Sequence, residues 1–245
     1  KRQLMKCFEA FYRPENMFLV VAGELEPQEV FERCNKYVRR RAGRAAPRLP
    51  EVHEPTKLCS KTVVERMHVE RPKLLVGFKD VKVPRLGPML LRRSIETELL
   101  VEIVFGKSSR VYQRLYEKGL IDETFSASYL ADRGFGHSAL GGDTDSPEAL
   151  LEAVVKAVNG VRDKGISKAS FSRIRKRVLG GYLRRFNSPE TVALRAVAAR
   201  FLEYNPFDVL GVVADITVED INRRLREHFK ESRMACSTVL PDGKP

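Results

Sequence analysis

Histidines are the first residues to weigh for catalysis, because a zinc hydrolase needs at least two ligands one helical turn apart on a rigid helix. The chain has four, and no two are four residues apart: His53, His68, His137 and His228. The stretch from His228 to Glu231 begins like an HxxEH motif, but its fifth position is Ser232. We therefore expect no metal ligand, and interpret His228 as a surface histidine at a helix C-terminus, where a cation is favoured.

Other patterns that carry chemistry are incomplete as well. No GxSxG sequence positions a serine nucleophile. The glycine-rich pieces Gly134-Phe135-Gly136 and Gly141-Gly142-Asp143 lack the order of strand, loop and lysine found in nucleotide-binding loops, so we interpret them as hairpin turns. The basic residues between Arg173 and Arg185 could meet phosphate or an acidic partner, but a solvated helix face explains them more simply.

Composition narrows the class of protein. The 245 residues are 43% hydrophobic and 31% charged, enough to bury a core. The longest apolar run, Met17 to Ala22, is too short to cross a bilayer, so we expect a soluble protein with no membrane partner. The formal charge of +12 raises the question of nucleic acid. Over half of that excess lies between Arg33 and Arg48, without an acidic residue, in a predicted helix end and linker. We therefore expect no nucleic-acid partner.

The cysteines bear on the compartment. Cys7, Cys34, Cys59 and Cys236 show no CxxC spacing. This scatter is typical of inert thiols in a reducing compartment rather than of a disulfide framework or a zinc ribbon. We therefore expect a cytoplasmic protein.

Residues 1–45 predict a helix, a strand and a second helix. A helical apolar pattern over residues 4–12 stops at Arg13-Pro14, because the residue before a proline avoids the α region. The run from Met17 to Ala22 predicts a strand covered on both faces. Glu26-Pro27 opens a helix that continues to Val38. Residues 46–57, rich in proline and charge, predict a domain linker.

The remaining residues, 58–245, predict an α+β domain. Strands are expected at 62–69, 74–78, 125–130, 137–140 and 234–240, and helices at 86–105, 110–117, from Pro147 to near Gly165, and at 167–186, 189–203 and 217–230. Ser146 is a predicted N-cap, and Thr217 with Asp220 forms a capping box. Paired strands interleaved with long helices predict a mostly antiparallel sheet with helices packed on one face.

A weak internal repeat is present. The predicted helix ending at Tyr12 and the strand beginning at Met17 recur 217 residues later, at Phe229 and Met234. If the match is not chance, residues 1–45 are the tail of a first repeat and residues 58–245 are a complete second repeat.

Three stretches resemble the pitrilysin and insulin-degrading enzyme family of inverted-zincin metallopeptidases, which includes the mitochondrial processing peptidase. They are the segment from Phe11 to Met17 with Val20 to Gly23, the segment from Gly106 to Leu120, and Phe186 to Glu190. The resemblance implies a duplicated α+β unit whose first copy binds zinc through HxxEH and whose second copy faces it across a proteolytic chamber. This chain then holds the second copy, so the zinc of the full-length protein is bound outside it and no catalytic residue is expected here.

The resemblance also implies a substrate site. In active relatives the second copy supplies an arginine and a tyrosine that hold the substrate backbone. Tyr116 and Asp122 stand at these two positions, and neither can present the forked cation that grips a peptide carbonyl. Arg110 and Arg114 lie nearby, as does Tyr129. The candidate substrate-binding residues are therefore Arg110, Arg114, Tyr116 and Asp122.

Two functions follow from the resemblance. The first is the substrate-chamber half of a zinc metalloendopeptidase that cleaves peptides or unfolded segments and takes the missing arginine and tyrosine from a homologous partner subunit, in a homodimer or heterodimer. The second is a non-catalytic scaffold or core-type subunit that keeps the chamber without the chemistry.

Overall fold

The computed structural model describes residues 1–38, 47 and 53–243, and the chain divides into two compact units. One unit consists of Lys1–His53 and Arg185–Ala198, and the other of Glu54–Arg184 and Ala199–Pro245. The arginine-rich stretch from residue 39 and most of the predicted linker 46–57 lie outside the described residues.

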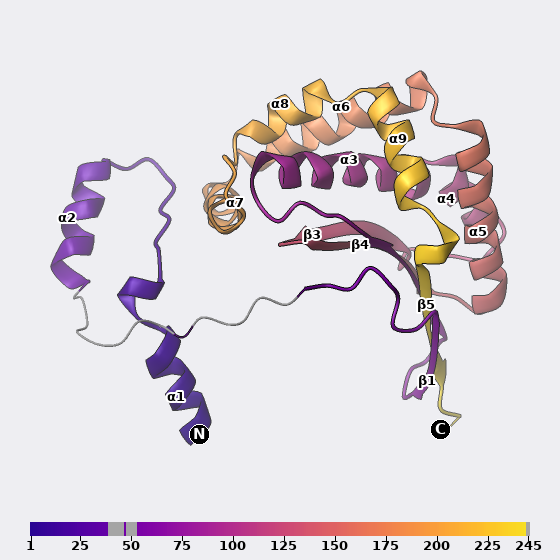
Figure 1. Cartoon of the computed structure of the whole chain (residues 1–245), viewed down its shortest axis with the longest axis horizontal. Helices are drawn as coiled ribbons and strands as arrows, with labels where there is room; N and C mark the ends of the chain where they lie inside the picture. The colour runs from indigo at the N-terminus through magenta and orange to yellow at the C-terminus, as the bar shows by residue number, and fades with distance from the viewer. Residues whose placement is uncertain (39–46, 48–52, 244–245) are drawn as a thin grey trace. The chain divides into compact units, whose positions relative to one another are not determined.

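The first unit contains helices α1 (Arg2–Phe11) and α2 (Pro27–Tyr37), the short 3-10 helix η1 (Pro14–Asn16) and most of α7 (Pro189–Leu202) (Figure 1). Both helices predicted near the N-terminus are confirmed. The strand predicted from Met17 to Ala22 is wrong. Met17 is extended, with φ −127° and ψ 156°, but the segment pairs with no strand in the described part of the chain. A strand needs a neighbour for its backbone hydrogen bonds, and a sequence pattern does not supply one.

The second unit is built on one sheet. In the described residues the sheet has five strands in the order β1-β5-β2-β4-β3. Their bounds are Thr62–Met67 (β1), Lys73–Asp80 (β2), Ser126–Asp132 (β3), Phe135–Asp143 (β4) and Met234–Pro241 (β5). Every pairing is antiparallel except that of β1 with β5, which is parallel. The predicted α+β class with a mostly antiparallel sheet is confirmed.

Helices of this unit stack on one side of the sheet, as predicted (Figure 1). Their bounds are Gly87–Phe105 (α3), Arg110–Glu117 (α4), Pro147–Lys164 (α5), Lys168–Arg185 (α6), Asp208–Asp215 (α8), Val218–His228 (α9) and the 3-10 helix Glu231–Arg233 (η2). Helix α3 packs on β3 and α9, and α5 packs on β2. Helix α8 was not predicted, because its eight residues between two longer helices are too few to show a clear period.

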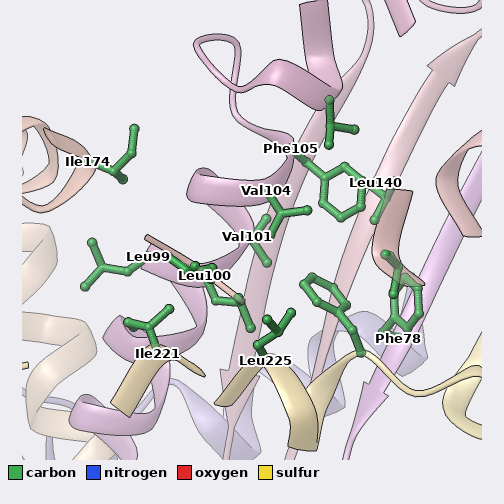
Figure 2. Close-up of a cluster of buried hydrophobic side chains, with 14 of the residues drawn as sticks. Phe78, Leu99, Leu100, Val101, Val104, Phe105, Leu140, Ile174, Ile221 and Leu225 are labelled. Atoms are coloured by element: carbon green, nitrogen blue, oxygen red, sulfur yellow. The ribbon is translucent and has the colours of Figure 1, made fainter. Parts of the chain in front are cut away.

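The core lies between this helix layer and the sheet. Alternate residues of β2, Leu74, Val76 and Phe78, are buried, as a strand with one covered face requires. Phe78 meets Phe229 edge to face, with ring centroids 4.9 Å apart. Figure 2 shows Phe78 and Leu140 of the sheet within one apolar cluster with residues of α3 and α9.

Two local predictions need correction. Gly141 and Gly142 do not form a turn but lie inside β4, where the carbonyl oxygen of Leu74 would be 1.9 Å from a Cβ added at Gly141. These glycines therefore allow a close backbone approach rather than a reversal of the chain. Ser146 makes no side-chain cap hydrogen bond to α5. The Thr217–Asp220 capping box on α9 is confirmed.

The internal repeat has a structural counterpart. Shifted by 217 residues, α1 coincides with α9 to within one residue at its start, and η1 coincides with η2. The following segment, from Met17, corresponds to β5, which lies between β1 and β2 in the sheet. The division of the chain into a first-repeat tail and a complete second repeat stays a prediction.

Candidate functional site

Helix α4 carries three of the four predicted substrate-binding residues, and both of its ends are fixed. At its start the buried Ser109 side chain accepts a hydrogen bond from the amide of Tyr112 at 3.0 Å. At its end Gly119, with φ 66°, takes the left-handed conformation, and Leu120 donates to the carbonyl of Leu115 at 3.0 Å. Because these caps set both ends, the register of the exposed residues on α4 is well defined.

The structure brings two of the predicted residues together on this helix. Arg110 and Arg114 are exposed, and the Nε of Arg114 donates to the carbonyl of Arg110 at 3.1 Å. Tyr116 lies on another face, because residues two apart on a helix do not share one. Its ring is 57% exposed and stacks on Tyr112, with centroids 6.2 Å apart.

Asp122 follows α4 in a loop and is bound to other residues. One of its oxygens accepts from the amide of Thr124 at 2.9 Å and from the Thr124 hydroxyl at 2.6 Å. The other pairs with Nη1 of Arg71 at 2.7 Å. The hydrogen bonds from Thr124, followed by the Arg71 pair, lower the pKa of Asp122 to about 2.

This pair belongs to a larger set of contacts at one end of the sheet, which we call the Arg71 clamp: Arg71, Lys73, Asp122, Thr124, Asp143 and Asp145. The Nε of Arg71 also bonds Asp145 at 3.1 Å. Thr124 accepts from the amide of Asp143 at 2.9 Å, and Asp143 pairs with Lys73 at 2.5 Å. The clamp ties the segment before β2, the loop between α4 and β3, and the segment between β4 and α5.

A second polar cluster is buried between the sheet and the helices. Asp80 ends β2 and has a fully buried side chain that pairs with Arg224 of α9 and, at 3.0 Å, with Arg93 of α3. The hydroxyl of Tyr129 donates to Asp80 at 2.7 Å. Burial opposes ionisation of this carboxyl, but His228, Arg224 and Tyr129 outweigh it and hold the pKa of Asp80 well below its usual range.

The prediction that His228 lies on the surface is wrong. Its side chain is fully buried, with Nδ1 3.0 Å from Nη2 of Arg224 and Nε2 2.8 Å from the hydroxyl of Ser138. An arginine only donates, so Nδ1 accepts, and Nε2 carries the proton and donates to Ser138. Burial, reinforced by the charge of Arg224, lowers the pKa of His228 to about 4 despite the nearby Asp80.

These contacts also settle the availability of Tyr129. Its hydroxyl is engaged with Asp80, and burial together with that carboxylate raises the pKa of the phenol. Tyr129 is therefore a structural residue rather than a second candidate for the missing tyrosine. The cluster joins residues up to 144 positions apart, so no local motif could have indicated it.

The described residues do not fit a zinc site. Across residues 1–38, 47 and 53–243, no group of three or more histidine, cysteine, aspartate or glutamate side chains could hold a metal ion. Both ring nitrogens of His228 are already engaged, and Ser232 replaces the second histidine of the motif.

An all-helical cover on one face of an antiparallel sheet, without a metal site, is the architecture expected of the zinc-free half of a peptidase. Residues 1–178 match the family model described as the Peptidase M16 inactive domain, and the chain belongs to this family. The match confirms the resemblance deduced from the segments around Phe11, Gly106 and Phe186.

Individual relatives agree with this assignment. The zinc protease YmfH of Bacillus subtilis is 35% identical over 243 residues, which cover 98% of this chain and 56% of YmfH. The zinc protease PqqE of Helicobacter pylori is 24% identical over 253 residues, 98% of this chain and 55% of PqqE. The crystal structure of an M16-like peptidase from Alicyclobacillus acidocaldarius superposes with a TM-score of 0.87 at 31% identity, covering 99% of this chain and 58% of that one. The chain thus spans about half the length of these relatives.

Proposed function

We propose that this chain is the substrate-chamber half of a zinc metalloendopeptidase that cleaves peptides or unfolded protein segments. The observation that carries the proposal is the match to the inactive domain of a peptidase family, over about half the length of relatives named zinc proteases. Because the described residues do not fit a zinc site, the zinc of the complete protein belongs to residues outside this chain.

The contribution of this half is to bind and orient the peptide. Arg110 and Arg114 are exposed cations on a doubly capped helix, and the exposed ring of Tyr116 offers an apolar surface. Tyr116 and Asp122 occupy the positions at which the family resemblance places an arginine and a tyrosine. A homologous subunit, identical or different, is therefore needed to supply that pair.

Activity measurements on the complete protein test this proposal. Alone, it should bind zinc but cleave an unfolded peptide poorly, and mixing with a homologous subunit should raise the rate strongly. A matched partner whose own arginine and tyrosine are replaced by alanine should give no increase. Strong cleavage by the lone protein, or an equal increase with the altered partner, would contradict the shared-site arrangement.

A non-catalytic scaffold subunit is the second candidate. It is favoured by Asp122, whose carboxylate is committed to Arg71 and Thr124 rather than open to a substrate. A scaffold should show no peptide turnover with any homologous partner, while the assembled complex loses stability without it. Turnover that disappears on chelation and returns with zinc would exclude the scaffold function.

We also propose that the protein works in the cytoplasm, because all four cysteines are free thiols. Across the helices that the structure describes, none is long and apolar enough to span a membrane. Cell fractionation with antibodies against the protein tests the compartment, and recovery outside the cytoplasmic fraction would contradict it.

A further inference from the structure

Arg71 stands out because it is anchored on one side and open on the other. Its guanidinium uses Nη1 for Asp122 and Nε for Asp145, at 2.7 and 3.1 Å. Its third nitrogen, Nη2, makes no hydrogen bond to any residue that the structure describes, and the side chain is 42% exposed. Two anchors hold the planar group in one orientation, so Nη2 is a fixed donor facing solvent.

The anchors themselves are rigid. Asp122 is held by two hydrogen bonds from Thr124, and Thr124 is held to β4 by the amide of Asp143. The orientation of Arg71 is therefore set by backbone segments at one end of the sheet rather than by flexible surface side chains. A positioned donor loses little conformational entropy when a ligand binds.

The charge balance of the clamp selects the ligand. Arg71 and Lys73 are countered by Asp122, Asp143 and Asp145, so the cluster is acidic by one charge. Such a surface repels a free carboxylate or a phosphate. A peptide carbonyl carries no net charge and needs only an N–H donor, which Nη2 provides.

We propose that Arg71 holds a backbone carbonyl in the interior of the peptide substrate. This rests on the proposed peptidase function, in which Asp122 occupies a position that the family resemblance assigns to substrate binding. Here the carboxylate of Asp122 does not contact the peptide but positions an arginine from another segment of the chain. The forked cation missing at position 116 is thus replaced by one that comes before β2.

Arg71→Lys in the complete protein, assembled with its homologous subunit, tests the assignment. A lysine can keep the ion pair with Asp122 but has one nitrogen and so no second donor for the peptide. We expect Kd for a fluorescent unfolded peptide and KM for its cleavage to rise about tenfold, the effect of losing one charge-assisted hydrogen bond. The thermal midpoint should stay close to that of the unaltered protein.

The matched control is Arg66→Lys. Arg66 is an exposed arginine on β1 that donates to the carbonyl of Pro241 at 3.0 Å. This variant should bind the peptide like the unaltered protein. Equal affinities for the two variants would overturn the assignment and leave Arg71 a purely structural residue.

Two further readouts separate the possible failures. A protein that binds peptide but cleaves none with any partner would refute the proposed function, while Kd would still judge Arg71. A protein that binds no unfolded peptide would refute both. Much tighter binding of a peptide with a free C-terminus than of its amidated form would overturn the interior-carbonyl assignment.

Discussion

At the scale of single residues, the Asp80 cluster is the costliest feature of the fold to disturb. Asp80 and Arg224 have side-chain exposures of 0% and 1%, and Arg93 is also directed at the same carboxylate. Removing one partner of a buried ion pair leaves the other charge without compensation. The cluster therefore links β2, α3 and α9 through charges that must all be present.

Asp80→Ala should lower the free energy of unfolding by about 3–5 kcal/mol, because Arg224 then stays buried without its counter-charge. Urea denaturation followed by circular dichroism measures the change. Lys73→Ala is the control, since it breaks an ion pair whose lysine is 51% exposed, and the expected loss is below about 1 kcal/mol. Comparable losses for the two variants would show that the Asp80 cluster is not stabilising.

The pH dependence of stability should reveal His228. Its pKa is about 4 in the folded chain against an ordinary value of 6.5, so the unfolded chain binds more protons between these values. Stability from this group is complete above pH 6.5 and is lost as the pH falls towards 4, by about 3 kcal/mol. Asp80, whose pKa is depressed, adds a further loss only at lower pH.

Denaturation at pH 7 and pH 4.5 measures this difference. His228→Gln should flatten the dependence, whereas His137→Gln, at an exposed histidine on β4, should leave it unchanged. An unchanged pH dependence in His228→Gln would place the titrating group elsewhere. The sequence could not indicate His228 as a core residue, because its partners Ser138 and Arg224 come from a distant strand and from its own helix.

At the scale of elements, the pairing of β2 with β4 depends on Gly141. A Cβ there would lie 1.9 Å from the carbonyl oxygen of Leu74, and the backbone has φ 152°. Gly141→Ala should therefore cost about 2–4 kcal/mol through overpacking and backbone strain. Gly160→Ala, inside α5 with nothing within 4 Å of its added Cβ, should instead stabilise the chain by about 0.5–1 kcal/mol. Thermal denaturation of both variants decides, and similar shifts would contradict the close approach.

Elements with strong local signals were predictable, and those that depend on distant partners were not. The bounds of α4 follow from Ser109 and Gly119, and α3 from its apolar period and the glycine at position 106. The short α8 has too few residues for a clear period. The segment from Met17 to Ala22 has strand composition, but no described strand lies beside it. For the candidate site, the positions on α4 were predictable, whereas the partnership of Asp122 with Arg71 required the fold.

At the scale of the whole molecule, the first unit exposes surfaces that the second unit buries. Leu4, Phe8 and Tyr12 of the first unit are 73%, 48% and 61% exposed. The residues 217 positions later, Ile221, Leu225 and Phe229, are at most 1% exposed. Apolar side chains in such a row are stable when another element covers them. The simplest cover is a sheet and helix like those beneath α9, which supports the prediction that residues 1–45 end a first repeat.

Cys7 offers a test without any substitution. It is exposed in this chain, whereas Arg224, its counterpart 217 residues later, is buried. In a longer polypeptide that carries a first repeat before Lys1, α1 should pack as α9 does, and a maleimide should modify Cys7 at least about tenfold more slowly than in this chain. Cys59, exposed and outside the repeated segment, is the internal reference and should react at similar rates in both proteins. Equal labelling of Cys7 in the two proteins would mean that α1 is not covered by a preceding unit, and the repeat would then be a coincidence of two common helix ends.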